Sequence, residues 1–101
     1  MEAPVMKAKR TSAKGKRRVA FEAQAPQGAI VFLAGSFNNW DPTAKQMVDK
    51  AGTGSFTATC MMTPGRYEYK LVVDGEWTVD PGNPNFIVNA VGTLNSLLEV
   101  S

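Results

Sequence analysis

The sequence predicts an all-β protein, and three observations support this prediction. Short segments alternate apolar and polar side chains, which is the period of a half-buried strand. Turn formers such as Gly, Pro, Asn and Asp separate these segments at intervals of about 8 to 12 residues, a spacing typical of sandwiches. No segment of useful length has the period of an amphipathic helix. We therefore expect about six to eight short antiparallel strands packed as a β-sandwich.

The N-terminal segment differs from the rest of the chain in charge. Residues 1–18 carry seven basic side chains and one acidic side chain, whereas residues 19–101 carry four basic and eight acidic ones. The first segment has no apolar period and cannot bury enough surface to offset its ordering entropy. We expect residues 1–17 to form a disordered basic tail and residues 18–101 to form one domain. The tail either only solvates the chain or serves as an arm for nucleic acid, an acidic partner or an anionic surface.

The composition excludes several kinds of site. A single cysteine, Cys60, cannot form an internal disulfide, and a chain without histidine is poorly suited to a zinc site or a serine–histidine catalytic pair. We therefore expect no metal and no cofactor. The sequence has neither an N-terminal apolar run of signal-peptide length nor a segment long enough to span a bilayer. We expect a cytoplasmic protein without membrane contacts.

The first half of the domain is expected to contain two strands followed by a loop. Alternation over residues 18–23 predicts a half-buried strand, and a Pro-Gln-Gly turn at 26–28 follows it. The apolar run 30–34 suits a strand buried on both faces. The next stretch, GSFNNWDP at 35–42, consists largely of turn formers, so we expect Trp40 to lie in a loop. Such a tryptophan either folds back over the core or is held outward to stack on a ligand, and the local sequence allows both.

The clearest hairpin signal lies in the second half of the chain. Residues 66–73 alternate and put two tyrosines on one face, and the Asp-Gly pair at 74–75 predicts a two-residue type I′ turn that places Val72 opposite Trp77. Residues directly opposite share a face, so Trp77 lies on the side of Lys70, away from the tyrosines. If the tyrosines face the core, Trp77 and Lys70 face outward. A sheet packed on both sides would bury Trp77 instead.

Weaker strand signals lie before and after this hairpin. A brief strand is compatible with residues 46–48. Residues 56–62 alternate and place Cys60 inward, where we expect it to act as a small inert hydrophobic side chain. Residues 80–89 contain two prolines, one glycine and three asparagines, which predicts a loop with at most a short edge strand at 86–88.

The C-terminal segment, residues 91–100, also alternates. Glu99 must be solvated, and the alternation puts Asn95 on the same face as Glu99. We therefore expect Asn95 to point outward.

Four motifs together resemble a known family. They are GSFNNWDP, PGRYEYKLVVDGEW, DPGNP and GTLNS, in this order and spacing. They are similar to the glycogen-binding module of the regulatory β subunit of AMP-activated protein kinase. They are equally similar to the early-set domain that precedes the catalytic barrel in isoamylases and glycogen branching enzymes, grouped as carbohydrate-binding module family 48. The resemblance covers residues 19–100 and implies an immunoglobulin-like sandwich of about seven strands that binds α-1,4-glucan without catalysis.

The resemblance also implies the binding residues. By position they are Trp40, Lys70, Trp77, Val91, Thr93 and Asn95. Val91 departs from the kinase subunits, which carry a leucine there, and we expect the shorter side chain to weaken the fit to a curved glucan. The chemistry agrees with the assignment, because a sugar ring needs flat aromatic platforms for its C–H faces and a few donors and acceptors for its hydroxyls.

Three classes of function therefore compete. The first is a stand-alone module that binds glycogen, starch or maltooligosaccharides and targets a glycogen-metabolising enzyme to them. The second is a sandwich used for protein–protein contact, with the basic tail docking an acidic partner. The third is an enzyme, which needs two carboxylates across a cleft. Asp74, Glu76 and Asp80 are candidates by type, but the turn explains Asp74 and the loop before Pro81 explains Asp80, so we expect no catalysis.

Overall fold

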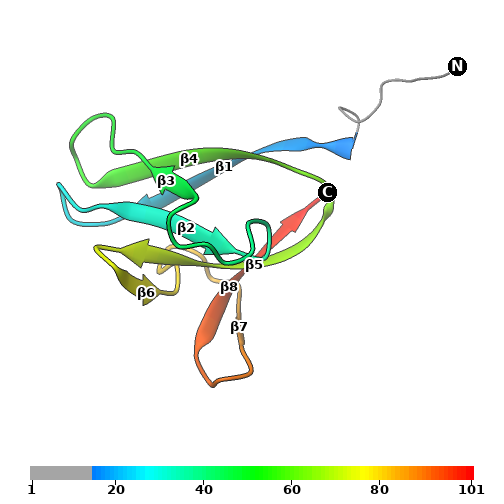
Figure 1. Cartoon of the computed structure of the whole chain (residues 1–101). Coiled ribbons are helices and arrows are strands. Elements are labelled where there is room, and N and C mark those ends of the chain that lie inside the picture. Colours follow the sequence, from blue (N-terminus) through cyan, green and yellow to red (C-terminus); the bar gives the residue numbers. More distant parts are fainter. Residues whose placement is uncertain (1–14) are drawn as a thin grey trace, which may run out of the picture.

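The computed structural model describes residues 15–101 and contains eight antiparallel strands (Figure 1). They are β1 (Arg17–Gln24), β2 (Val31–Gly35), β3 (Lys45–Met47), β4 (Ser55–Met62), β5 (Gly65–Val73), β6 (Glu76–Thr78), β7 (Phe86–Val88) and β8 (Leu94–Val100). The all-β prediction is confirmed. The predicted tail, apart from its last three residues, lies outside the described residues. Within residues 15–101, no helix has the length and apolar character needed to cross a lipid bilayer.

The strands form two sheets. One contains only β1 and β4, and the other has the order β3-β2-β5-β8-β7, with β6 paired to β5. Figure 1 shows β1 and β4 as a layer above β2 and β5, and it shows β6 and β7 below them. An isolated bridge between Val48 and Thr57 joins the two layers at one side. The larger sheet therefore has one face against the small sheet and one outer face.

The alternation in the sequence produces the core between these layers. Tyr69 of β5 is 4% exposed, and its ring meets that of Phe21 edge-on, with centroids 5.4 Å apart. Leu33 and Leu71, from neighbouring strands, are buried beside it. Cys60 packs against this core, and burial raises the pKa of its thiol. The predicted inward faces of β4 and β5 are therefore confirmed.

The hairpin between β5 and β6 has the predicted register. Val72 pairs with Trp77, and the turn residues Asp74 and Gly75 have φ values of 50° and 85°, as a type I′ turn requires. Asp74 also holds the turn to the chain before β2, because its Oδ1 accepts a hydrogen bond from the backbone N–H of Ile30 at 2.9 Å. Trp77 is 46% exposed on the outer face. The alternative of a sheet covered on both faces is therefore wrong at this position.

The chain before β2 differs from the prediction. Ile30 was expected to begin a strand buried on both faces, but the strand begins at Val31 and Ile30 is 55% exposed. The prediction holds for the strand itself, because Val31, Leu33 and Ala34 are fully buried and Phe32 is half-buried. Ile30 lies before the strand, where no element among residues 15–101 covers it. An apolar run in the sequence does not show at which residue a buried strand begins.

The loop between β6 and β7 contains a buried polar network. The Tyr69 hydroxyl donates to Asp80 Oδ2 at 2.7 Å, and the backbone N–H of Asp80 donates to Ser96 Oγ at 2.9 Å. Asn83 Nδ2 donates to the Tyr69 oxygen at 3.1 Å. Burial is the main cause that raises the pKa of Tyr69 far above its ordinary value. Asp80 thus lies in a loop as predicted, but it is also a buried partner of the core.

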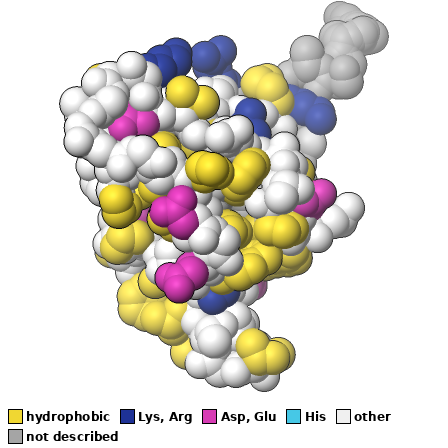
Figure 2. All heavy atoms as spheres, turned by 60° about the vertical axis from the view of Figure 1, so that its left-hand side comes forward, with side chains coloured by type: hydrophobic (Ala, Val, Ile, Leu, Met, Phe, Trp, Pro, Cys, Tyr) yellow, Lys and Arg dark blue, Asp and Glu magenta, His cyan; other side chains and the backbone are white. Residues whose placement is uncertain are grey.

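Charge is unevenly distributed on the surface. Figure 2 shows most of the visible Lys and Arg side chains near the top of that view, whereas acidic and apolar side chains are spread over the rest of this face. β1 begins at Arg17, whose Nε donates to the backbone oxygen of Ser101 at 3.0 Å. The two ends of the described chain therefore adjoin.

Candidate functional site

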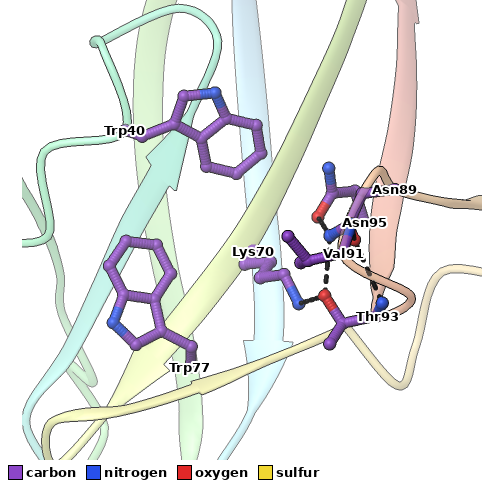
Figure 3. A pocket seen from close by; sticks show the side chains of 7 residues that line it. All are labelled: Trp40, Lys70, Trp77, Asn89, Val91, Thr93 and Asn95. Carbon is purple, nitrogen blue, oxygen red and sulfur yellow. Dashed lines mark hydrogen bonds between the residues drawn. The ribbon is translucent and has the colours of Figure 1, made fainter.

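The six predicted site residues lie together. They line one hollow of about 410 Å³ on the outer face of the larger sheet, and Asn89 lines it with them (Figure 3). This volume is within the range of about 300 to 1,000 Å³ typical of small-ligand sites. The residues come from the loop after β2, from β5, β6 and β8, and from the loop before β8. Sequence segments that are far apart thus meet at one place.

Trp40 is held in its loop by an unusual backbone. The predicted loop is confirmed, and Trp40 has a φ of 57°, in the left-handed region that bulky residues rarely occupy. Its N–H donates to the Gly35 oxygen at 2.9 Å. The side chain of Asn38 closes the same turn, accepting from the Gly35 N–H at 3.0 Å and donating to the Leu33 oxygen at 3.0 Å. Trp40 therefore faces the hollow instead of the core, in a conformation that the surrounding contacts must enforce.

Trp77 and Lys70 reach the hollow from the sheet itself. Figure 3 shows the two indole rings on one side of the open space, with Lys70 extending between them and the loop that precedes β8. Lys70 Nζ donates to Thr93 Oγ1 at 3.1 Å. Since an ammonium group has three N–H donors, two remain for a ligand. Indole platforms thus lie opposite hydrogen-bonding groups across the hollow.

The loop before β8 is organised by Asn89. Its Oδ1 accepts from the backbone N–H groups of Val91 and Thr93 at 3.1 and 3.0 Å. Its Nδ2 lies 2.6 Å from Thr93 Oγ1 and 3.0 Å from Asn95 Oδ1, so it donates to both. Gly92 completes the turn with a φ of 85°. Val91 is thereby held at the tip, where it is 83% exposed.

Asn95 lies on the predicted outer face but is not solvated. It is only 6% exposed, because the loop held by Asn89 covers it. Its Nδ2 donates to Glu68 Oε1 at 2.9 Å, and its Oδ1 accepts from Asn89. One N–H and one lone pair of the amide stay unused by these two bonds. The expectation that Asn95 points outward is therefore correct, although the side chain is buried on that face.

The sequence did not lead us to predict Asn89 and Glu68 as residues of the site. Asn89 stands four residues before Thr93 in a segment with a glycine, a pattern typical of side chains that close turns. That signal could have identified it. Glu68 gave no such signal, because its partner lies 27 residues further along the chain.

The arrangement suits an uncharged ligand with both apolar and polar faces. Among residues 15–101, Lys70 is the one cation that lines the hollow, and Glu68, behind Asn95, is the one carboxylate bonded to its lining. Within residues 15–101, no cluster of His, Cys, Asp or Glu could hold a metal ion. Asp74 is used in the hairpin turn and Asp80 in the buried network, so neither belongs to this hollow.

Comparisons with known proteins agree with this chemistry. A family model described as the glycogen recognition site of AMP-activated protein kinase matches residues 18–101. Protein PTST homolog 2, chloroplastic, of Arabidopsis thaliana is 44% identical over 71 residues, which are 70% of this chain and 13% of that protein. The 5'-AMP-activated protein kinase subunit beta-1 of Sus scrofa is 36% identical over 73 residues, which are 72% of this chain and 56% of that protein. This chain thus spans less than two thirds of these relatives.

A solved structure shows the same fold. The enterobactin esterase FES from Shigella flexneri matches with a TM-score of 0.66 and 19% identity, over 84% of this chain and 30% of the esterase chain. At this identity the likeness concerns the fold alone.

Proposed function

This chain belongs to the family of glycogen recognition sites of AMP-activated protein kinase, and from that membership we propose that it binds α-1,4-glucan on the hollow between Trp40, Trp77 and Asn95. It is a non-catalytic glucan-binding module. One observation supports this location above all others. The residues assigned by position come from separate segments and line a single hollow, with two indoles on one side and polar groups on the other.

The two indoles supply most of the binding energy. A glucose ring presents C–H groups on its faces, and these pack on an aromatic plane. If each indole and its sugar ring cover about 50 Å² of one another, burial contributes roughly 2 to 3 kcal/mol per stack at about 25 cal/mol/Å². Ordering of the ligand offsets much of this gain. We expect a dissociation constant of roughly 10 μM to 1 mM for a short oligosaccharide.

The polar side of the hollow recognises the hydroxyls at the rim of the sugar. Lys70 donates, the Thr93 hydroxyl donates because it already accepts from Lys70 and Asn89, and Asn95 offers its remaining N–H. Val91 lies at the exposed tip of its loop and packs into the curve of the glucan. Its small side chain leaves this contact weaker than a leucine would.

Titration with β-cyclodextrin, followed by tryptophan fluorescence, tests the proposal. We expect a saturable change, because at least one indole leaves water when the sugar binds. Constant fluorescence, together with no heat in a parallel calorimetric titration, would refute glucan binding at this face.

The partners of the module are a separate part of the proposal. We infer that it brings a glycogen-metabolising enzyme to its substrate, because one of its relatives is by name a subunit of an enzyme, 5'-AMP-activated protein kinase. We also propose that the protein is cytoplasmic. The basic residues before and at the start of β1 are candidates for contact with an acidic partner.

A further inference from the structure

A second hollow adjoins the first one at Trp77. Its volume is about 370 Å³, and its apolar walls come from Ile30, Phe32, Pro42 and Val72, with Trp77 at the boundary. Trp77 lines both hollows, so its indole forms the boundary that they share. We call this second hollow the Phe32 groove.

The floor of the groove is a row of side chains across three strands. Phe32 of β2 pairs with Val72 of β5, which in turn pairs with Trp77 of β6. Paired residues project from the same face of a sheet, so the row continues the outer face on which the first hollow lies. Val72 is only 4% exposed although no second sheet within residues 15–101 covers this face, because its neighbours in the row enclose it. An apolar surface thus runs from Trp77 across the sheet to the exposed Ile30.

The rim of the groove contains a few polar groups. Thr43 and Asp74 line it, and Asp74 uses Oδ1 for the backbone N–H of Ile30. Asp74 Oδ2 has no hydrogen-bond partner among residues 15–101 and can accept from a ligand hydroxyl. An apolar floor with an acceptor at its edge offers a sugar ring the same two kinds of contact as the first hollow.

We propose that the Phe32 groove binds further glucose units of the same α-glucan chain, so that a long chain continues past Trp77 over Phe32 and Ile30. This inference rests on the proposed function. Continuity favours a glucan over a partner protein, because a chain stacked on Trp77 has the groove directly beside it. The groove thereby makes the module selective for longer glucans, and it explains why Ile30 is an exposed apolar residue beside the hairpin turn.

Calorimetric titration with linear maltooligosaccharides of roughly three to ten glucose units tests the inference. The variants are Phe32→Ala, which removes the centre of the floor, and Ile30→Ser, which changes an exposed side chain and leaves the core intact. Met61→Ala is the matched control, because Met61 is 58% exposed on β4 and lines neither hollow. A two-dimensional NMR titration of the backbone amides of Thr43 and Gly75 gives a second readout.

In the wild type we expect affinity to rise with chain length beyond the shortest binding sugar, by roughly fivefold, the ratio that about 1 kcal/mol gives. Ile30→Ser and Phe32→Ala should lose most of this gain while binding the shortest sugar as the wild type does. Met61→Ala should keep it, and the amides near the groove should shift only with the longer sugars. If Phe32→Ala does not fold, Ile30→Ser and the NMR titration decide the question.

Two other outcomes would overturn the inference. If the gain with length is absent in the wild type, or is kept in the groove variants without shifts of the nearby amides, the groove does not bind glucan and is free for another occupant, such as an apolar side chain of a partner protein. If no maltooligosaccharide of any length binds, the proposed function itself fails. The short sugars therefore distinguish the two failures.

Discussion

Asn89 donates a hydrogen bond from Nδ2 to Asn95 Oδ1 at 3.0 Å, so one asparagine orients the amide of another inside the hollow. The same side chain holds the backbone of Val91 and Thr93. We expect Asn89→Ala to reduce maltoheptaose affinity by about tenfold, because the loop residues lose their fixed positions. Stability should fall by no more than about 1.5 kcal/mol, since water can replace bonds at an exposed loop.

Calorimetry and urea unfolding measure these two effects. Asn85→Ala is the matched control, because Asn85 lies in the preceding loop and does not line the hollow. Unchanged affinity in Asn89→Ala would show that the loop keeps its shape without this side chain.

Trp40→Ala and Trp77→Ala should each lose most of the sugar affinity. Both side chains lie outside the buried core, so the free energy of unfolding should stay close to that of the wild type. Leu71→Ala is the contrasting variant, because Leu71 is 1% exposed and its truncation should cost about 2 to 5 kcal/mol. A melting temperature in either tryptophan variant as low as that of Leu71→Ala would mean that the ring stabilises the fold.

The backbone at Trp40 gives a separate prediction. A non-glycine residue in the left-handed region costs roughly 1 to 2 kcal/mol, and Trp40 has a φ of 57°. We therefore expect Trp40→Gly to be more stable than Trp40→Ala by about 1 kcal/mol, although neither variant binds glucan well. Equal unfolding free energies of the two variants would indicate that the loop relaxes to another conformation once the indole is gone.

Alkaline pH should destabilise the protein through Tyr69. Burial raises its pKa in the folded state, so the unfolded chain releases this proton first, near the ordinary tyrosine pKa of about 10. Above that pH the unfolded state binds fewer protons than the native state, and stability falls as pH rises. Urea unfolding between about pH 8 and about pH 11 measures the slope.

Tyr69→Phe is the variant that isolates this effect. It should lower stability near neutral pH by about 1 to 3 kcal/mol, because Asp80 loses a buried partner. Its stability should then decline less steeply above pH 10 than that of the wild type. If the stability of both proteins declines equally steeply above pH 10, groups other than Tyr69 cause the loss of stability at alkaline pH.

The salt dependence of affinity should distinguish glucan binding by the sandwich from any DNA binding by the basic N-terminal segment. Glucan is uncharged, so its affinity should hardly change between about 50 and 500 mM salt, and deleting residues 1–14 should leave it unchanged. The deletion ends at residue 14 because Arg17 begins β1 and binds the C-terminal end. If the intact chain binds duplex DNA, the four cations removed should account for a slope of roughly −3 to −4 in log K against log salt. Loss of glucan binding on deletion would make the segment part of the site.

Local signals in the sequence predicted most of the strands and the position of Trp77. The period of two and the Asp-Gly turn depend on neighbouring residues only, and the hairpin register follows from them. Burial of Asn95 and exposure of Ile30 could not be predicted in this way. Both depend on what covers the outer face of the sheet: the loop held by Asn89 covers Asn95, whereas no element among residues 15–101 covers Ile30.

The same distinction applies to the site. The resemblance assigned Trp40, Trp77 and Lys70 by position, and the structure brings them to one hollow. The roles of Asn89 and Glu68 and the existence of the Phe32 groove emerge only when β2, β5 and β8 are placed side by side.

Calorimetric titration of the wild-type protein with maltoheptaose and, separately, with cellohexaose tests the central claim most directly. We predict that maltoheptaose binds with a dissociation constant of roughly 10 μM to 1 mM and that cellohexaose binds at least about tenfold more weakly. The reason is that the straight β-1,4 chain cannot present consecutive rings to two indoles placed along a curve. Equal affinity for both sugars, or no binding of maltoheptaose, would contradict the account.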